Sequence, residues 1–386
     1  MKRLGIFMSV ALIAVICLGG CAPEFEKPSL EDMAMIGVIG FDYTGDQDVK
    51  VSVSIPVPSS RDKEMTQTYT TNASVTSEAM VMLSTMAERT MSLSQLRVIL
   101  FSEEYARKVG LSKVLLDLYR NPIVGENVFV AIVKGRAEDV IRGEFKHKPE
   151  LNTYLNNLLR PRVETAFTSF ASIKDFVYML TSEVCDPNLP YLVKRGEDVE
   201  VWRVALFRGD KMIDYMSQRE GKLVQAMVGR GRLPRMNFTF PKKEKKGTKI
   251  EGVSAEKSSE QKEEQIVLDF VWAKGRVRSN GSQTKPLIHI SLEMRASLVG
   301  YTGTKDLEKK AQFDALKTQL EAQIKKEATL MLDRLQKANI DPAQLEESLR
   351  QKYHGAWNRT VGLKLYQKAE FDVQVSIEII GFGTMD

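Results

Sequence analysis

The first 21 residues constrain this chain most strongly, because they determine where it folds. Lys2 and Arg3 precede an almost wholly apolar run over residues 4–16, and Gly19 and Gly20 follow that run. A basic start, an apolar middle and small residues before a cut are typical of a secretory signal. A bilayer span needs about 20 apolar residues, and the glycines interrupt the run before that length. We therefore predict export and cleavage, not a permanent transmembrane helix.

The residues Leu18-Gly19-Gly20-Cys21 resemble a bacterial lipobox, in which the cysteine thiol receives a diacylglyceryl group and becomes the new N-terminus. Each buried CH₂ of an acyl chain such as palmitate contributes about 0.8 kcal/mol, so one chain holds a protein marginally and two hold it stably. We predict lipidation at Cys21, which would keep the rest of the chain at a membrane surface. The alternative is an ordinary cleaved signal followed by a chance cysteine.

Composition is that of an ordinary globular protein of two or three domains. The chain has 386 residues, of which 43% are hydrophobic and 27% charged. The net charge of +5 falls to +3 when Lys2 and Arg3 leave with the signal, an excess too mild for a dedicated nucleic-acid binder and suited to anionic lipid. Cys17 would also leave, so Cys185 has no disulfide partner, and stability must come from core burial.

After a lipidated tether at 21–29, periodicity predicts a mixed α and β region over 30–195, with room for two subdomains. Residues 33–42 and 49–55 form a hairpin, and residues 96–101 form a buried strand. Ser102 is the expected cap of a helix that continues to about residue 120. Further helices are expected at 77–89, 151–159 and 173–180, and a strand at 128–133.

A break at residues 185–190 places the boundary of a C-terminal α+β domain at 196–386. Its expected elements are a hairpin around Gly209, strands at 223–228, 236–240, 266–277, 287–298 and 371–379, and a long helix at 306–337. A charged loop is expected near 241–264. Asp341, with Pro342 and Gln344, has the spacing of a capping box. The fold class is thus α+β, multi-domain, with mixed sheets and packed helices and a C-terminal antiparallel sheet covered by the long helix.

The sequence contains no pattern that predicts catalysis. The three histidines, His147, His289 and His354, are isolated, and no nucleophile elbow, phosphate-binding loop or dinucleotide fingerprint is present. Adjacent acidic pairs such as Glu346 and Glu347 point in different directions on a helix, so they cannot share one substrate. We therefore expect no catalytic residues, no cofactor and no metal ion, and Cys21 is the one predicted site.

Several segments in order resemble the Ger(x)C family, the lipoprotein C subunits of spore germinant receptors. They are residues 30–42 (LEDMAMIGVIGFD), 96–106 (LRVILFSEEYA), 127–135 (NVFVAIVKG), 205–212 (ALFRGDKM) with Glu220-Gly221 after it, and 345–353 (LEESLRQKY) followed by Trp357. The frequent Cys-Trp-Asp opening of the family is replaced here by Cys21-Ala22-Pro23. These motifs are structural, so the specificity of the resemblance lies in their order along nearly the whole mature chain.

The resemblance implies a non-enzymatic subunit anchored by lipid on the outer, extracytoplasmic face of the spore inner membrane. Its partners would be the two integral membrane subunits of a germinant receptor, and membrane lipid through Cys21. The family supplies no catalytic residues. Two other functions stay open: a solute-binding lipoprotein that captures a nutrient in a deep polar cleft, and an envelope hydrolase with a nucleophile and a base in one pocket.

Overall fold

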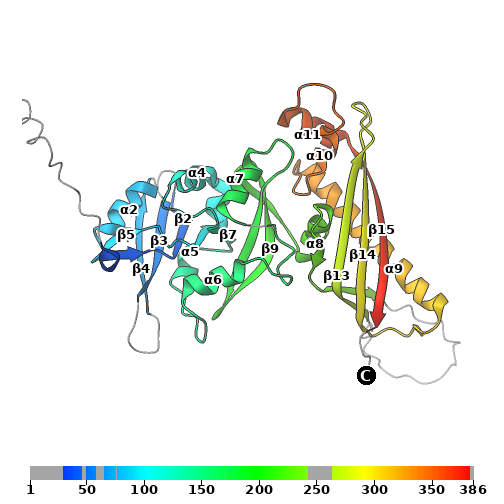
Figure 1. Cartoon of the computed structure of the whole chain (residues 1–386), viewed down its shortest axis with the longest axis horizontal. Coiled ribbons are helices and arrows are strands. Elements are labelled where there is room, and N and C mark those ends of the chain that lie inside the picture. The colour runs from blue at the N-terminus through cyan, green and yellow to red at the C-terminus, as the bar shows by residue number, and fades with distance from the viewer. Residues whose placement is uncertain are drawn as a thin grey trace, which may run out of the picture.

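A computed structural model of the chain describes residues 29–45, 49–57, 65–74, 76–169, 171–241 and 263–382. The predicted signal peptide at 1–20, Cys21 and nearly all of the predicted charged loop at 241–264 lie outside the described residues. Two large sheets dominate the described part, each packed against helices (Figure 1). The predicted α+β fold with mixed sheets and packed helices is confirmed.

The larger sheet has eight strands with a parallel centre and antiparallel flanks. In spatial order they are β10 (Lys211–Met216), β9 (Asp198–Arg208), β8 (Asn188–Arg195), β7 (Phe129–Val133), β6 (Val98–Ser102), β2 (Val38–Tyr43), β3 (Val49–Val57) and β4 (Met65–Ala73). Strands β8, β7, β6 and β2 are parallel, and every other pair in the sheet is antiparallel. The carboxyl ends of four parallel strands therefore meet at one edge of this sheet.

Both faces of the central strands are buried, which explains their continuous apolar runs. In β6, Val98 and Leu100 join one hydrophobic core, whereas Ile99 and Phe101 join the other, because successive side chains point to opposite faces. One face is covered by α2 (Thr76–Ser84), α3 (Glu103–Lys108), α4 (Ser112–Arg120) and α7 (Ile173–Thr181). The other face is covered by α5 (Ala137–Ile141), α6 (Leu151–Leu159) and the C-terminal part of the chain.

The N-terminal end of the described chain forms a small structure beside this sheet. A 3-10 turn, η1 (Leu30–Asp32), leads into β1 (Met33–Met35), which pairs in parallel with β5 (Thr90–Ser92). The expected strand at 33–42 is thus divided into β1 and β2. This structure lies at the left side of Figure 1.

The C-terminal sheet contains two long strands, β13 (Glu263–Ser279) and β14 (Leu287–Tyr301), which pair antiparallel, with β11 (Arg232–Leu233) and β12 (Met236–Pro241) on the outer edge of β13. The last strand, β15 (Glu370–Phe382), pairs in parallel with β14. The sheet is therefore mixed rather than purely antiparallel. The cause is the long helical connection between β14 and β15, since parallel neighbours require a crossover.

That crossover begins with α9 (Lys310–Lys337), whose apolar stripe lies on the sheet as predicted. The buried residues of the stripe include Leu316, Leu320, Ile324, Met331 and Leu335. Two short helices follow, α10 (Leu345–Arg350) and α11 (Arg359–Lys368). They lie at the upper end of the C-terminal sheet in Figure 1.

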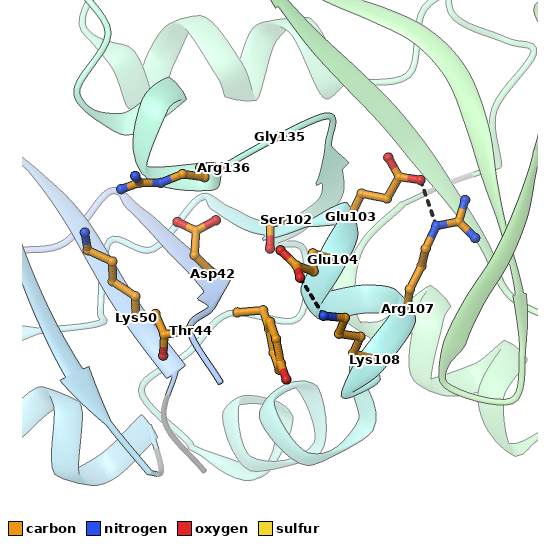
Figure 2. Close-up of a pocket in the computed structure, with 11 residues that line it drawn as sticks. Asp42, Thr44, Lys50, Ser102, Glu103, Glu104, Arg107, Lys108, Gly135 and Arg136 are labelled. Carbon is orange, nitrogen blue, oxygen red and sulfur yellow. Dashed lines mark hydrogen bonds and ion pairs between the residues drawn. The ribbon is translucent and has the colours of Figure 1, made fainter. Parts of the chain in front are cut away.

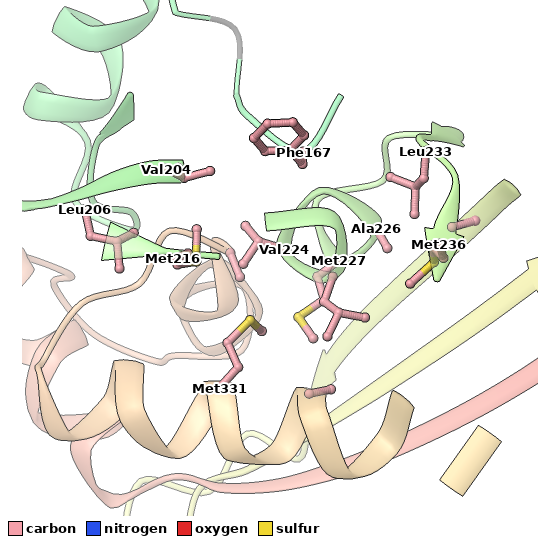
Figure 3. Close-up of a cluster of buried hydrophobic side chains, with 14 of the residues drawn as sticks. Phe167, Val204, Leu206, Met216, Val224, Ala226, Met227, Leu233, Met236 and Met331 are labelled. Atoms are coloured by element: carbon pink, nitrogen blue, oxygen red, sulfur yellow. The ribbon is translucent and has the colours of Figure 1, made fainter. Parts of the chain in front are cut away.

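Helix α8 (Gln218–Met227) lies between the two sheets and joins their cores (Figures 1 and 3). Val204 of β9, Val224 of α8 and Met331 of α9 belong to one continuous cluster of buried apolar side chains. Two glycines allow the close approach of α8. A Cβ atom at Gly221 would lie 2.4 Å from the Phe167 carbonyl oxygen, and one at Gly275 of β13 would lie 2.2 Å from the Ala226 carbonyl oxygen.

Several sequence predictions are wrong in detail. Residues 223–228 are not a strand but the end of α8, which begins with a capping box between Ser217 and Glu220. Strand β4 forms at residues 65–73, where the sequence analysis expected no element, and the helix expected over 103–120 is interrupted at Gly110, which has a φ of +94°. Asp341 does cap backbone N–H groups, but α10 begins at Leu345, so the predicted capping box with Gln344 is absent.

The predicted domain boundary between residues 195 and 196 lies in the turn from β8 to β9. These two strands pair from Asn188 with Leu206 to Arg195 with Asp198, so the eight-stranded sheet contains strands from both sides of that position. The assignment of 30–195 and 196–386 as separate domains stays a prediction.

Candidate functional site

The residues singled out in the sequence do not assemble into a site in the described part of the chain. Cys21 lies outside it, eight residues before Ser29, where the description begins. His147, His289 and His354 are all exposed, and His289 pairs through Nδ1 with the Asp372 carboxylate at 3.0 Å. Among the described residues, no group of three potential ligands could hold a metal ion, and no helix has the length and apolar character to cross a bilayer.

A cavity of about 530 Å³ opens where the parallel strands end (Figure 2). Asp42 at the end of β2, Ser102 at the end of β6 and Gly135 just after β7 lie at its wall, with the charged residues of α3 opposite. In open α/β sheets this edge is where ligands commonly bind, because the connections that follow the strands diverge there. We therefore call this the strand-end pocket.

One wall of the strand-end pocket is neutralised by the protein itself. The Asp42 carboxylate accepts hydrogen bonds from the backbone N–H groups of Ala137 at 2.6 Å and Glu138 at 2.9 Å, at the start of α5. It therefore takes the place that a ligand anion could occupy. Burial raises the pKa of Asp42, although the backbone hydrogen bonds act in the opposite direction. Glu138 in turn binds Lys50 at 2.7 Å and Arg142 at 3.0 Å.

The opposite wall is also internally paired. Arg107 binds Glu103 at 2.7 Å and donates to the Ile213 carbonyl oxygen at 2.9 Å, and Lys108 binds Glu104 at 2.7 Å. The Tyr191 hydroxyl donates to the second oxygen of Glu103 at 2.5 Å. A ligand in this pocket would have to compete with these contacts. The pocket thus offers space and charge, and its ionisable groups are held by contacts within the protein, including a hydrogen bond between the Ser102 side chain and the Asp42 carboxylate.

A second polar cluster lies where the two parts of the molecule meet, with its three acids buried and its arginine partly exposed. It consists of Asp186, Asp341, Glu346 and Arg359, and we call it the carboxylate cluster. Asp186 precedes β8, Asp341 follows α9, Glu346 lies in the first turn of α10, and Arg359 begins α11. Arg359 binds Glu346 at 3.0 Å and makes a short contact with Asp186. The Asp341 carboxylate accepts from the Glu346 N–H at 2.7 Å.

The carboxylate cluster holds more acid than base. Burial raises the pKa of Asp341 to about 7 and the pKa of Glu346 to about 8, and in each case the negative charge of the other carboxylates adds to the effect. Arg359 acts in the opposite direction on both groups. The neighbouring Cys185 is also buried, and burial raises the pKa of its thiol to about 11, so it is held as an unreactive thiol at neutral pH.

The sequence analysis treated Glu346 and Glu347 as an adjacent pair that faces two ways and cannot share one substrate. They do face two ways, since Glu347 binds the exposed Arg350 at 2.6 Å, but Glu346 has no exposed side-chain surface. A signal was present: Glu346 lies between Leu345 and Leu349, on the apolar side of a short helix. An acid in that position needs a buried partner, and Arg359 supplies it from the next helix.

The fold and its two polar clusters can now be compared with known proteins. The sequence matches two family models in tandem, the spore germination protein N-terminal domain over residues 26–194 and the spore germination B3/GerAC-like C-terminal domain over residues 203–383. The chain therefore belongs to the Ger(x)C family of spore germination proteins. The resemblance stated from the sequence is confirmed.

Two relatives cover nearly the whole chain. The spore germination protein GerQC of Bacillus cereus is 23% identical over 386 residues, which is 100% of both chains. The crystal structure of the GerBC protein has a TM-score of 0.53 and 17% sequence identity, and the match covers 89% of this chain and 96% of that chain. The structural match shows a common fold.

Proposed function

We propose that this chain is the lipid-anchored C subunit of a spore nutrient germinant receptor, required for the germination response as a non-enzymatic scaffold or signalling component. The observation that carries the proposal is the tandem match to both spore germination domains over residues 26–194 and 203–383. Its partners would be the two integral membrane subunits of the receptor. Its location would be the extracytoplasmic face of the spore inner membrane.

Attachment in this proposal depends on Cys21. The eight residues from Cys21 to Ser29 can extend at most about 29 Å. The lipid would therefore hold the end of the molecule that carries β1 and β5 close to the membrane surface (Figure 1). No described helix could replace this anchor by crossing the bilayer.

Internal pairing in the strand-end pocket supports a non-enzymatic role. The acids Glu103 and Glu104 each bind a base one turn further along α3, and Asp42 caps α5. General acid-base or nucleophilic catalysis requires a group whose reactive atom is free to meet a substrate. The pocket residues instead hold the ends of the parallel strands and their helices in place.

Spores that carry Cys21→Ala test the proposal. We expect the variant protein to be lost from the membrane fraction and germination with nutrients to be impaired. The control Cys185→Ala should leave both unchanged, because Cys185 is buried and forms no disulfide. Membrane fractionation with immunoblotting and the loss of optical density after nutrient addition measure the two effects. Release of Cys21→Ala from membranes together with normal nutrient germination would contradict the anchored-subunit mechanism.

The second candidate is direct capture of a small polar nutrient, and the strand-end pocket favours it because a volume of about 530 Å³ lies within the range of small-molecule sites. Titration calorimetry of the purified protein with amino acids and sugars distinguishes the two functions. A saturable heat that is lost in Arg107→Ala would support capture by this subunit. The scaffold proposal predicts no saturable heat.

A further inference from the structure

The carboxylate cluster connects the two parts of the molecule through reciprocal hydrogen bonds. The Asp186 N–H donates to the Asp341 carbonyl oxygen at 2.9 Å, and the Asp341 N–H donates to the Asp186 carboxylate at 2.8 Å. Nearby, the Trp357 Nε1–H donates to the Glu183 carbonyl oxygen at 3.3 Å, and Arg208 of β9 donates to the Ala338 carbonyl oxygen. Each of these contacts joins the eight-stranded sheet and its loops to the segments that follow α9.

Charge within the cluster is not balanced by its ion pairs. Three carboxylates face one guanidinium, and Arg359 reaches only two of them directly, Asp186 and Glu346. The Glu346 Oε2 atom is buried and has no hydrogen-bond partner in the described part of the chain. Space for it exists because residue 362 is glycine, where a Cβ atom would lie 2.3 Å from that oxygen. An unpaired buried carboxylate is costly, and a proton removes the cost.

We propose that the carboxylate cluster is a proton-operated joint, in which protons held by Asp341 and Glu346 keep the two parts of the molecule docked and their loss loosens them. The protons come from solvent and return to it, and no other covalent bond changes. The proposal is independent of the receptor function, because it concerns only contacts within this chain.

The direction of the pH effect follows from burial. Both acids have a raised pKa when docked, about 7 for Asp341 and about 8 for Glu346, against ordinary values near 4 when exposed to water. Between these limits each acid holds a proton in the docked form that it releases in the loosened form. Docking is therefore strongest below about pH 4.5 and weakens as the pH rises towards 8.

Other groups also face Glu346 and Asp341. Burial raises the pKa of Asp186, although Arg359 and the Asp341 N–H act in the opposite direction. The Tyr366 hydroxyl donates to the Ile340 carbonyl oxygen at 3.1 Å, and burial raises its pKa well above the ordinary value. Arg208 also faces Asp186, where its positive charge lowers the pKa of that acid. Burial raises the pKa of the neighbouring Cys185 thiol to about 11, above the pH range in question.

Cys185 provides a reporter beside the joint. Its thiol is buried next to Asp186, so it reacts with a thiol reagent only when this contact opens. Labelling of the full chain with iodoacetamide at pH 5.5, 6.5 and 7.5 is followed by mass spectrometry of the peptide that contains Cys185. Rates are divided by those of the protein unfolded in urea at the same pH, which removes the titration of the thiol itself.

We expect the protection of Cys185 in the wild type to fall by at least about tenfold per pH unit, since each proton released contributes a tenfold slope. In Glu346→Gln the slope should be shallower by the contribution of one proton, because the neutral amide mimics the protonated acid and only Asp341 still titrates. The matched control Glu347→Gln lies one residue further along α10 and binds the exposed Arg350, so it should keep the wild-type slope.

The proposal is overturned if wild-type protection is the same at all three pH values, or if Glu346→Gln retains the wild-type slope. Circular dichroism establishes that each variant is folded. If Glu346→Gln does not fold, Asp341→Asn takes its place, since an asparagine oxygen can still accept the cap hydrogen bond from the Glu346 N–H. A wild-type slope in that variant also refutes the joint.

Discussion

Substitution of Gly275 by alanine should show how firmly α8 is held between the two sheets. The added Cβ atom would lie 2.2 Å from the Ala226 carbonyl oxygen and 2.9 Å from the Met227 Cα atom, so backbone would have to move by roughly 1 Å to restore an ordinary contact. Helix α8 cannot simply retreat, because Gly221 already brings it against the Phe167 carbonyl oxygen on its other side. Overpacking of this kind costs about 1–3 kcal/mol.

Urea unfolding followed by circular dichroism measures this loss. The matched control is Gly125→Ala, at an exposed loop position where the added Cβ would meet no atom within 4 Å. That control should leave the stability unchanged or raise it by about 0.4–1 kcal/mol through the unfolded state. A Gly275→Ala protein as stable as Gly125→Ala would refute the view that α8 is wedged between two cores.

Three further changes test individual contacts. Arg359→Met should lower the free energy of unfolding by about 3–5 kcal/mol at pH 8, and by less at pH 5, where the carboxylate partners of Arg359 take up protons. At the exposed Arg350, the same change to methionine should lower it by under about 1 kcal/mol. Equal urea midpoints for the two variants would contradict this expectation. Asp42→Ala should cost about 1–2 kcal/mol and speed amide exchange at the start of α5; unchanged exchange there would show that the cap is dispensable. Ser217→Ala should cost about 1 kcal/mol in the same urea assay by removing the capping box of α8, and an unchanged midpoint would contradict that role.

Local patterns predicted many elements correctly, because they depend on neighbours in sequence. Helix α6 spans residues 151–159 as expected, and the β9–β10 hairpin turns at Gly209, which has a φ of +58°. Ser102 caps α3 by accepting from the Tyr105 N–H at 3.2 Å. In each case the apolar spacing and the turn or cap residue agree.

Secondary-structure predictions failed where the apolar residues of a short segment fitted both the helical and the strand spacing. Residues 223–228 are apolar enough for a strand, but Ser217 and Glu220 start a helix just before them. The side chains of residues 223–227 are then all buried, because this part of the helix lies between the two sheets. Strand β4 was missed because residues 65–73 are rich in threonine and polar side chains. It forms at the edge of the sheet, where pairing with β3 provides the stabilisation.

The sequence by itself predicted an export signal and an anchor at Cys21, and it determined the α+β class and the resemblance to the Ger(x)C family, since each depends on residue order over short distances. Only the tertiary structure decided that β15 runs parallel to β14 and that Glu346 and Asp186, 160 positions apart in the chain, bind the same Arg359. Whether an acid is solvated or buried depends on which distant backbone and cation pack against it. Such contacts arise only after long loops close, and no local pattern encodes them.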